Sequence, residues 1–494
     1  MTTTIKILRS YTTESWSRYN DIYRAFRVSL FSTGTVTCSA SASKDTLYGR
    51  IMPFGSPRIS ILPILDQWAR EGRCVEQEEL LVIIKKLRMF RRFKHALEVS
   101  EWMSNKRYFD LKPRDMAIRL HLISKVHGIE QAEKYFNNIP IPSRDCHVYG
   151  ALLGCYAHAK YLEKAEGIMQ KMSELGFNKT PLNYNVMLKL YAEVGKHEKS
   201  DSLMQEMEEK GIPGDQYTFN TRLHEYITSS DLEGMESLLM KMEANHAVAI
   251  NWNTYALVAN GYLKVGAAEK ALTMLKKSEK LVKVKKRRFA YEVFLTLYAR
   301  LGNKSEVCRI WNLFQKAEKI YNMAYFSMIS SLAILDDLDG AEKIWEEWEA
   351  KKTYYDSRIP YFLVNAYCKK GLVKKAESIV NRVIENGEEP SASMWDKLAI
   401  QYHENHQMDK AVETMKKATL MSKSGWKPNL ATVAACLEHL KGIGSTEVAV
   451  EFIELLKERG HISGENLKSL LDYMKNVNSE FKVFDLMSGD NRVL

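Results

Sequence analysis

The sequence predicts an all-α protein, a right-handed α-solenoid of about eleven two-helix repeats of about 35 residues. Three observations support this class. The 494 residues are 45% hydrophobic, which is enough for a folded chain, and the chain is too long for a single core. Only 25 Gly and 11 Pro are present, fewer than a turn-rich β protein needs. Short motifs also recur at a fixed spacing, which is the signature of a repeat architecture.

The composition excludes several other classes of protein. The apolar stretches are short, such as residues 80–84, so no segment is expected to span a membrane. The seven cysteines include no Cys-x-x-Cys pair and their number is odd, so neither a zinc ribbon nor a disulfide framework is indicated. The formal net charge of +10 suits a polyanionic partner without requiring one.

Residues 1–44 have the composition of an organellar transit peptide. They are rich in Ser and Thr and carry six cations against two acids, as expected of a basic amphipathic segment that is removed after import. The run from Arg24 to Thr33 resembles plant mitochondrial presequences, so we expect cleavage near Phe31 and delivery to the mitochondrial matrix. A chloroplast address and a tail without targeting function are the alternatives.

Three further segments follow in the predicted organisation. Residues 45–76 precede the first repeat and are expected to form an N-terminal helical cap. The repeat array occupies residues 77–460. Residues 461–494 are expected to form one more helical hairpin, 463–474 and 479–487, which caps the final apolar face of the array.

The repeat is defined by a period of about 35 residues. The segment 183–188, which opens Asn-Tyr-Asn, recurs at 218–223 as Thr-Phe-Asn, so Asn185 and Asn220 lie one period apart. We call this residue the anchor. The same register, with steps of 33 to 38 residues, gives the anchors Leu81, Ala117, Gly150, Asn185, Asn220, Ala256, Glu292, Phe326, Tyr361, Asp396 and Ala434.

Other positions keep the same register. A small residue, usually Ala, stands fifteen residues after most anchors, Tyr often stands six residues after, and Gly often stands ten or 26 residues after. The small residue lets two helices approach closely, and Gly suits the left-handed backbone that ends a helix. Each repeat is therefore predicted as two helices and two turns, whose apolar stripes are buried only when neighbouring repeats stack.

The best copies of the repeat carry a family resemblance. Residues 183–215 and 216–251 open with Tyr-Asn or Phe-Asn motifs, and the first closes with Gly-Ile-Pro-Gly-Asp. This pattern resembles the pentatricopeptide repeat (PPR) of organellar RNA-binding proteins, and the block 65–68, Leu-Asp-Gln-Trp, looks like that of the short plant mitochondrial members of P type. The tetratricopeptide repeat, which binds peptides, has a similar period, but its Trp, Leu-Gly and Pro positions are missing here.

The resemblance implies that a repeat can read one RNA base with two side chains, the anchor and the last residue of the repeat. By resemblance, Asn185 with Asp215 favours uracil, and Asn220 with Asn251 favours cytosine. Amide and carboxylate groups there supply directional donors and acceptors. Most other pairs depart from the family pattern and spell no base; they include Glu292 with Tyr321, Phe326 with Asp356, Tyr361 with Ser391 and Asp396 with Asn429.

Cations are expected to add affinity that does not depend on RNA sequence. The position eight residues after the anchor faces the RNA backbone in the family, and it holds Lys125, Lys264, Arg300 and Lys369. Acidic residues occupy it in other repeats, so the attraction to phosphate is expected to be patchy. The basic run 276–288 leaves three interpretations open, a solvated helix face, an RNA-contacting patch and a nuclear localisation signal.

No catalytic residue, cofactor or metal site is indicated. His403 and His406 have no assignable third ligand, and the neighbours Cys146 and His147 are interpreted as an accident of sequence. Relatives of this family that edit RNA carry a deaminase signature, His-x-Glu with Cys-x-x-Cys, which this chain lacks. We therefore expect a binding protein and not an enzyme.

Three functions remain open from the sequence. The first is an organellar RNA-binding protein that contacts single-stranded RNA in a concave groove, one base per repeat, and acts in transcript stability, processing, splicing or translation in mitochondria. The second is a structural or accessory subunit of the mitochondrial ribosome, because two readable repeats do not specify a unique RNA site. The third is a protein-binding helical scaffold.

Overall fold

The computed structural model describes residues 45–56, 59–105, 109–245, 248, 250–284, 287–317, 319–352, 354–423, 425–475 and 483. Every regular element in these ranges is a helix, so the predicted all-α class is confirmed. The helices form two compact units, one up to Glu225 and one from Tyr226 onward. Each unit is described by itself. The predicted transit peptide, residues 1–44, lies outside the described residues.

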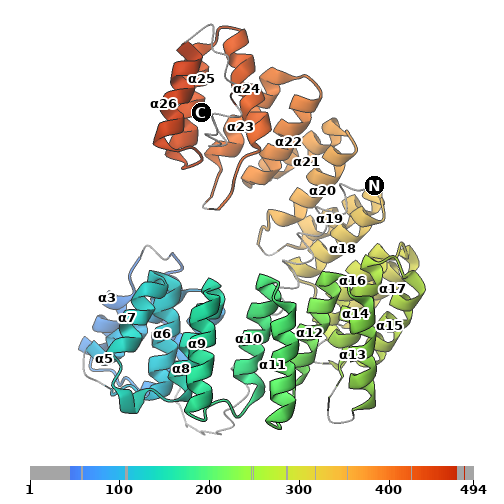
Figure 1. The fold of residues 1–494 in the computed structure, drawn as a ribbon. Helices are drawn as coiled ribbons and strands as arrows, with labels where there is room; N and C mark the ends of the chain where they lie inside the picture. The colour runs from blue at the N-terminus through green and yellow to red at the C-terminus, as the bar shows by residue number, and fades with distance from the viewer. Residues whose placement is uncertain are drawn as a thin grey trace, which may run out of the picture. The chain divides into compact units, whose positions relative to one another are not determined.

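The first unit begins with two short helices and continues with helix pairs (Figure 1). The opening helices are α2 (Leu47–Ile51) and α3 (Leu62–Arg70). The pairs are α4 (Gln77–Met89) with α5 (Phe93–Asn105), α6 (Pro113–His127) with α7 (Ile129–Asn138), α8 (Cys146–Ala159) with α9 (Leu162–Glu174), and α10 (Pro181–Val194) with α11 (His197–Glu209). A 3-10 helix, η1 (Ile141–Ser143), joins α7 to α8.

The second unit continues the same pattern, and α12 (Gln216–Ser229) runs from the first unit into it. The partner of α12 is α13 (Leu232–Ala244). The later pairs are α14 (Trp252–Lys264) with α15 (Ala268–Lys280), α16 (Arg287–Arg300) with α17 (Lys304–Ala317), α18 (Asn322–Ile334) with α19 (Leu338–Lys351), α20 (Arg358–Lys369) with α21 (Val373–Glu385), α22 (Ala392–Glu404) with α23 (Met408–Leu420), and α24 (Leu430–Gly442) with α25 (Thr446–Glu458).

The predicted two-helix repeats are confirmed by the positions of the anchors. Each anchor, from Leu81 on α4 to Ala434 on α24, lies on the first helix of a pair. First helices pack against one another in chain order, as α6 does on α8 and α18 does on α20. The small residues fifteen positions after the anchors have no exposed surface, as close helix packing requires; they are Ala96, Ala132, Ala165, Ser200, Ala271, Ala341, Ala376, Ala411 and Ala449.

The turn after each first helix uses left-handed backbone. Gly195, at φ 73°, ends α10, and the predicted glycine is the residue that accepts this conformation without steric cost. In most repeats without a Gly ten residues after the anchor, another residue adopts the same backbone, with φ between 56° and 64°: Arg91, Lys160, Ser230, Asp336 and His406. The repeat of Ala117 is an exception, because α6 ends at Gly128 with φ 86° and ψ 176°. The turn geometry is therefore imposed by the packing of the two helices and not by glycine.

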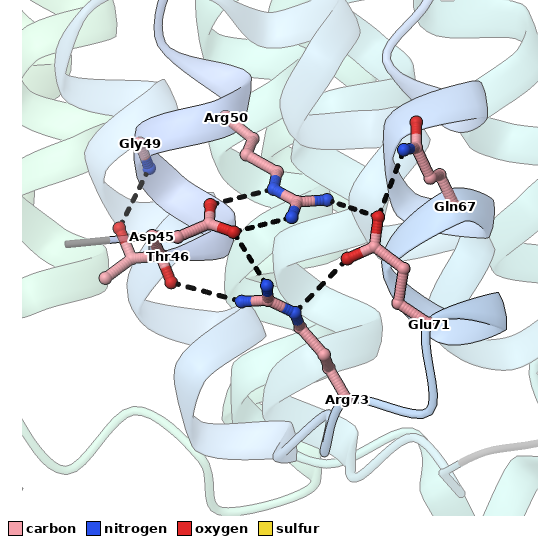
Figure 2. Close-up of polar contacts among 7 residues, drawn as sticks. All are labelled: Asp45, Thr46, Gly49, Arg50, Gln67, Glu71 and Arg73. Atoms are coloured by element: carbon pink, nitrogen blue, oxygen red, sulfur yellow. Dashed lines mark hydrogen bonds and ion pairs between the residues drawn. The ribbon is translucent and has the colours of Figure 1, made fainter. Parts of the chain in front are cut away.

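A charged network fixes α2 against the end of α3 (Figure 2). Arg50 donates to Asp45 Oδ1 and to Glu71 Oε1, each at 2.8 Å, and Arg73 pairs with the same two carboxylates at 2.8 and 3.2 Å. Both guanidinium groups lie over the Trp68 ring, 5.0 and 4.6 Å from its centroid. The Arg50 guanidinium holds the pKa of both carboxyls below their usual values.

These two helices dock on the first repeat. The Ile61 N–H donates to Glu98 Oε2 at 2.8 Å, and Trp102 Nε1 donates to Asp66 Oδ1 at 2.8 Å, so α3 and α5 are joined by polar contacts as well as by packing. Glu98 is only 8% exposed, and its charge is compensated by a backbone donor. We propose that residues 45–76 cap the apolar face of the first repeat.

The far end of the second unit carries α26 (Gly464–Lys475), which packs on α25. This helix occupies the place of the predicted segment 463–474. Its predicted partner, 479–487, lies outside the described residues apart from Val483. Across the described ranges no helix combines the length and the apolar character that crossing a membrane requires.

Candidate nucleic-acid interface

The structure joins the predicted pair Asn185 and Asp215. Asn185 Nδ2, on α10, donates to Asp215 Oδ1 at 3.2 Å, although 30 residues separate them in the chain. Asn185 Oδ1 accepts from the Thr218 hydroxyl at 2.7 Å. Asn185 is 4% exposed and Thr218 is fully buried, so both ends of the Asn185 amide are occupied. A ligand that hydrogen-bonds to this amide must therefore use its second N–H or its second lone pair, or replace one of these two contacts.

A second repeat shows the same spatial relation between its anchor and its last residue. Asp396, the anchor on α22, accepts a hydrogen bond from the Asn429 backbone N–H at 3.1 Å. Burial raises the pKa of Asp396 above its usual value. The anchor of a repeat and its last residue thus meet in one repeat of each unit.

The last residue of a repeat also starts the next first helix. The Asp215 carboxylate accepts from the Thr218 N–H at 2.9 Å, and Asn251 Oδ1 accepts from the Asn253 and Thr254 N–H groups at 2.8 and 3.3 Å. A side chain in this place satisfies N–H groups that have no partner inside the helix. The same role is filled in other repeats by Asp145, Asp356 and Asn429.

The second predicted pair spans the two units. Asn220 is half-buried on α12 in the first unit, whereas Asn251 belongs to the second unit at the start of α14. The helix-capping role of Asn251 gives a structural reason for an Asn at this position. Sequence reasoning assigned this residue to RNA alone and missed its role in the fold.

The four predicted cations lie near the ends of first helices. Lys264 Nζ donates to the Ile227 carbonyl at 3.3 Å, and Arg300 Nη1 donates to Asn260 Oδ1, so both bind the first helix of the preceding repeat. Lys125 lies in the last turn of α6. Burial lowers the pKa of Arg300. These cations therefore join repeats, a contribution that the spacing alone did not reveal.

Lys369, at the end of α20, has a different environment. It makes no hydrogen bond or ion pair within the described ranges, and neither does Lys397 on α22. Loss of solvent around its ammonium group and the like charge of Lys397 lower the pKa of Lys369. Two neighbouring cations that form no hydrogen bond or ion pair within the described ranges are suited to an anion such as a phosphate group.

A series of polar contacts, which we call the tyrosine ladder, links the second helix of one repeat to both helices of the next repeat. Tyr262, six residues after its anchor, donates its hydroxyl to Glu236 Oε1 of the preceding repeat at 2.9 Å. Lys270 pairs with the same carboxylate at 2.8 Å and lies 5.5 Å from the centroid of the Tyr262 ring. The same triad occurs in Glu166 with Tyr191 and Lys199, and in Glu377 with Tyr402 and Lys410. Sequence reasoning found these tyrosines but not their bonds.

One group of possible metal ligands occurs within the described ranges. Asp145, Cys146 and His147 lie together at the start of α8, and the Sγ of Cys146 is 3.6 Å from His147 Nδ1. The Asp145 carboxylate accepts the His147 and Val148 N–H groups and contacts the His147 ring at 2.9 Å. These contacts describe a helix cap, with Cys146 and His147 exposed beside it.

Comparison with known proteins decides the family. A PPR repeat family model matches residues 179–228, and a PPR repeat model matches 147–177 and 362–388. A mitochondrial pentatricopeptide repeat-containing protein of Arabidopsis thaliana is 45% identical over 458 residues, which is 93% of each chain. The chain belongs to the pentatricopeptide repeat family. Two of the matched ranges fall on hairpins that carry the anchors Gly150, Asn185 and Asn220, so the predicted PPR repeats are confirmed there.

Two other comparisons describe the range of the PPR relatives. The large ribosomal subunit protein mL101 of Arabidopsis thaliana is 42% identical over 419 residues, which cover 84% of this chain and 85% of that protein. A crystal structure of a pentatricopeptide repeat protein in complex with an 18-nucleotide RNA element matches with a TM-score of 0.49 and 18% identity, over 84% of this chain and 58% of that one.

Proposed function

We propose that this PPR protein binds single-stranded RNA in the mitochondrial matrix and acts in mitochondrial RNA metabolism, through contacts of one base per repeat. The observation that carries the proposal is the hydrogen bond between Asn185 and Asp215. It brings together, from the two ends of one repeat, two side chains that the family resemblance assigns to one base. The relatives named mitochondrial support the location.

The geometry also indicates how a base is bound. The Watson–Crick edge of a uracil carries one donor between two acceptors, so it can take the place of Thr218 or Asp215 on the Asn185 amide. Exchange of one hydrogen bond for another has a small net free energy, of about 1 kcal/mol. Discrimination at one repeat is therefore modest, and affinity must come from several repeats together.

A structural role in the mitochondrial ribosome is the second candidate function. Its support is the 42% identity with protein mL101 of the large ribosomal subunit. It also agrees with the small number of amide pairs, since only Asn185 with Asp215 and Asn220 with Asn251 match the family pattern for reading bases. In this function the RNA partner is ribosomal RNA, held by shape and backbone contacts.

One experiment separates these functions. Tagged protein is isolated from mitochondria under mild salt, the RNA crosslinked to it is sequenced, and the same extract is sedimented on a gradient. A transcript-binding factor yields a few short footprints containing a uracil–cytosine step from a light fraction. A ribosomal subunit yields dominant ribosomal RNA crosslinks that sediment with a ribosomal particle. Absence of any RNA crosslink contradicts both and favours the protein-binding scaffold.

Variants at the readable repeats test the base contacts. Asn185→Ala and Asn220→Ala should each weaken binding to the footprint RNA about tenfold, since a base-edge contact contributes about 1 to 3 kcal/mol. Asn251→Ser is a third variant of this kind, because Ser keeps the helix cap while the amide that the resemblance assigns to a base is removed. Unchanged affinity and base preference in the Asn185 variant, with an intact fold, would rule out base reading at this repeat.

A further inference from the structure

Repeats whose residue pairs spell no base carry aromatic and guanidinium groups instead. On α16, α18 and α20 these are Arg288, Tyr321, Phe326, Arg358, Tyr361 and Phe362, and we call them the stacking surface. Tyr321 immediately precedes α18. The three helices belong to one unit and pack side by side, α16 on α18 and α18 on α20. The stacking surface is therefore one feature of consecutive repeats and not a set of scattered rings.

The first part of the surface is an arginine stacked on a tyrosine. The guanidinium carbon of Arg288 lies 4.3 Å from the centroid of the Tyr321 ring, and Lys319 Nζ lies 5.5 Å from the same centroid. Tyr321 is 41% exposed, so part of its ring is accessible to a ligand. A guanidinium plane and a phenol ring are the two groups on which unpaired bases stack in RNA-binding proteins.

In the second part of the surface, aromatic rings occupy the anchor positions that hold an amide in the repeats of Asn185 and Asn220. Phe326 and Tyr361 are the anchors of successive repeats, and Phe362 lies between them in space, with ring centroids at 4.8 and 6.3 Å. The planes are nearly perpendicular, at 82° and 87°, so each pair leaves at least one ring face uncovered by its partner. Arg358 lies 5.7 Å from the Phe326 centroid. All three rings are partly exposed.

The charges around the surface suit a polyanion. Lys369, two turns beyond Tyr361 on α20, and Lys397 on α22 make no hydrogen bond or ion pair within the described ranges. Asp356 is neutralised by Arg358 at 2.6 Å. Glu292 faces Arg288 at 3.5 Å, and burial raises its pKa to about 7, so it carries only part of its charge at neutral pH. Local repulsion of phosphate is therefore weak.

We propose that the stacking surface holds unpaired RNA bases by stacking and does not select among the four bases, an inference that rests on the RNA-binding function proposed above. Every base has a π face, so stacking on a ring tolerates any sequence. The amides of Asn185 and Asn220 then provide the preference for particular bases, and the stacking surface provides affinity for any base. In this arrangement the residue pairs that match no base-reading pattern contribute to the affinity for RNA.

The test compares RNAs that differ only in their bases. Binding of the full chain is measured by fluorescence anisotropy, with single-stranded homopolymers of each base, with an oligomer containing a run of abasic residues, and with double-stranded RNA. We expect every homopolymer to bind, with differences of about tenfold that come from the uracil and cytosine preferences of the Asn185 and Asn220 pairs. The abasic oligomer should bind about tenfold more weakly, and the duplex, whose bases are already stacked, should bind weakly. Equal binding of the abasic oligomer overturns the proposal.

Substitutions in the stacking surface test whether its rings account for the affinity for RNA. Phe326→Leu with Tyr361→Leu keeps apolar volume but removes the π faces, and it should weaken binding to every homopolymer about tenfold without changing the salt dependence, because no phosphate contact is lost. Tyr161→Leu removes an exposed ring outside the stacking surface and should bind as the wild type does. If the double leucine variant misfolds, ultraviolet crosslinks of wild-type protein to RNA still decide, since they must map to α18 and α20.

The outcomes separate this inference from the proposed function. If the Asn185 variant loses binding while the double leucine variant does not, the stacking surface is excluded and base reading stands. If wild-type protein binds none of the RNAs, the RNA-binding function itself fails. If a protein segment displaces the homopolymers and no crosslink maps to α18 or α20, the surface is a protein-docking site and the proposal is wrong.

Discussion

At the scale of single residues, the left-handed turns show where the chain carries strain. Lys160, at φ 60°, ends α8 in the place that Gly occupies in other repeats. A side chain in this backbone conformation costs about 1 to 2 kcal/mol, and its Cβ is the cause. The strain is tolerated because the two helices that the turn joins are held by their buried stripes.

We therefore predict that Lys160→Gly raises the stability of the first unit by about 1 kcal/mol, which is less than the strain because Gly adds freedom to the unfolded chain. Lys160→Ala is the control, since it removes the same side chain but retains a Cβ, and it should bring no gain. Urea unfolding, followed by circular dichroism, measures both. An equal gain in the two variants would assign the effect to the lysine charge.

Removal of a helix-capping side chain is expected to lower the stability of the protein even in the absence of RNA. Asn251→Ala should destabilise the second unit by about 1 kcal/mol, because the Asn253 and Thr254 N–H groups lose their acceptor. Asn251→Ser should cost only a few tenths of this. The comparison is made by urea unfolding in the absence of RNA. No difference between Ala and Ser would mean that the cap contributes nothing to stability.

At the scale of helices, one exception to the repeat pattern is compensated by its neighbour. Met235 on α13 stands where other repeats have Ala, and it is 1% exposed. Gly261 on α14 provides the space: a Cβ built there would lie 2.6 Å from Met235 Sδ and 2.8 Å from Ile227 Cγ1. A large residue on one helix is thus paired with the absence of a side chain on the next.

This pairing predicts a coupled double-mutant cycle. Gly261→Ala should destabilise the second unit by about 1 to 3 kcal/mol, because overpacking outweighs the gain of about 1 kcal/mol in helix propensity. Met235→Ala should cost about 2 to 5 kcal/mol through a cavity. The double variant should be more stable than the sum of the two by about 1 kcal/mol or more. Strict additivity in thermal unfolding contradicts a direct contact.

The tyrosine ladder predicts an alkaline effect. Burial and the Glu236 carboxylate raise the pKa of Tyr262 to about 12, above its ordinary value of 10.0. The folded state therefore favours the protonated phenol, and the resulting stability is fully present below pH 10 and is lost as the pH rises through about 12.

The measurement is the titration of phenolate absorbance. Difference titration of wild-type protein against Tyr262→Phe should show a phenol that ionises near pH 12. In Glu236→Gln the same phenol should ionise at lower pH, because the carboxylate no longer disfavours its charge. Glu233→Gln, on the same helix but outside the triad, is the matched control. A Tyr262 that titrates at its ordinary value in wild-type protein would exclude the hydrogen bond.

At the scale of the whole molecule, the sequence was sufficient for the repeats and insufficient for their polar contacts. The positions of Asn185, Asn220 and the buried alanines follow from a period, because stacking repeats forces equivalent residues into equivalent places. The bonds of Thr218 to Asn185, and of Lys264 to Ile227, join different helices, and no local pattern encodes them. Aromatic residues at anchors were likewise dismissed because they match no base-reading pair.

The ends of the array allow a prediction for the whole chain. A protein that begins at Asp45 keeps the network of Arg50, Glu71 and Arg73 and should fold as the full chain does. A protein that begins at Gln77 loses α2 and α3 and uncovers apolar surface on α5, so it should unfold at lower temperature and associate. Calorimetry and size-exclusion chromatography compare the two. Equal behaviour would show that residues 45–76 are not a cap.

In several repeats the residue that closes the repeat also caps the next helix, and at these positions the fold restricts how such a protein can acquire a new RNA target; the residues are Asp145, Asp215, Asn251 and Asn429. Good helix starters form a set of four, Ser, Thr, Asp and Asn. A substitution of Asp215 or Asn251 by a residue outside this set changes the base preference of the repeat and also destabilises the following helix. A new base specificity at these positions is therefore most accessible through residues that also cap a helix, so the requirements of folding limit the residues available for RNA recognition.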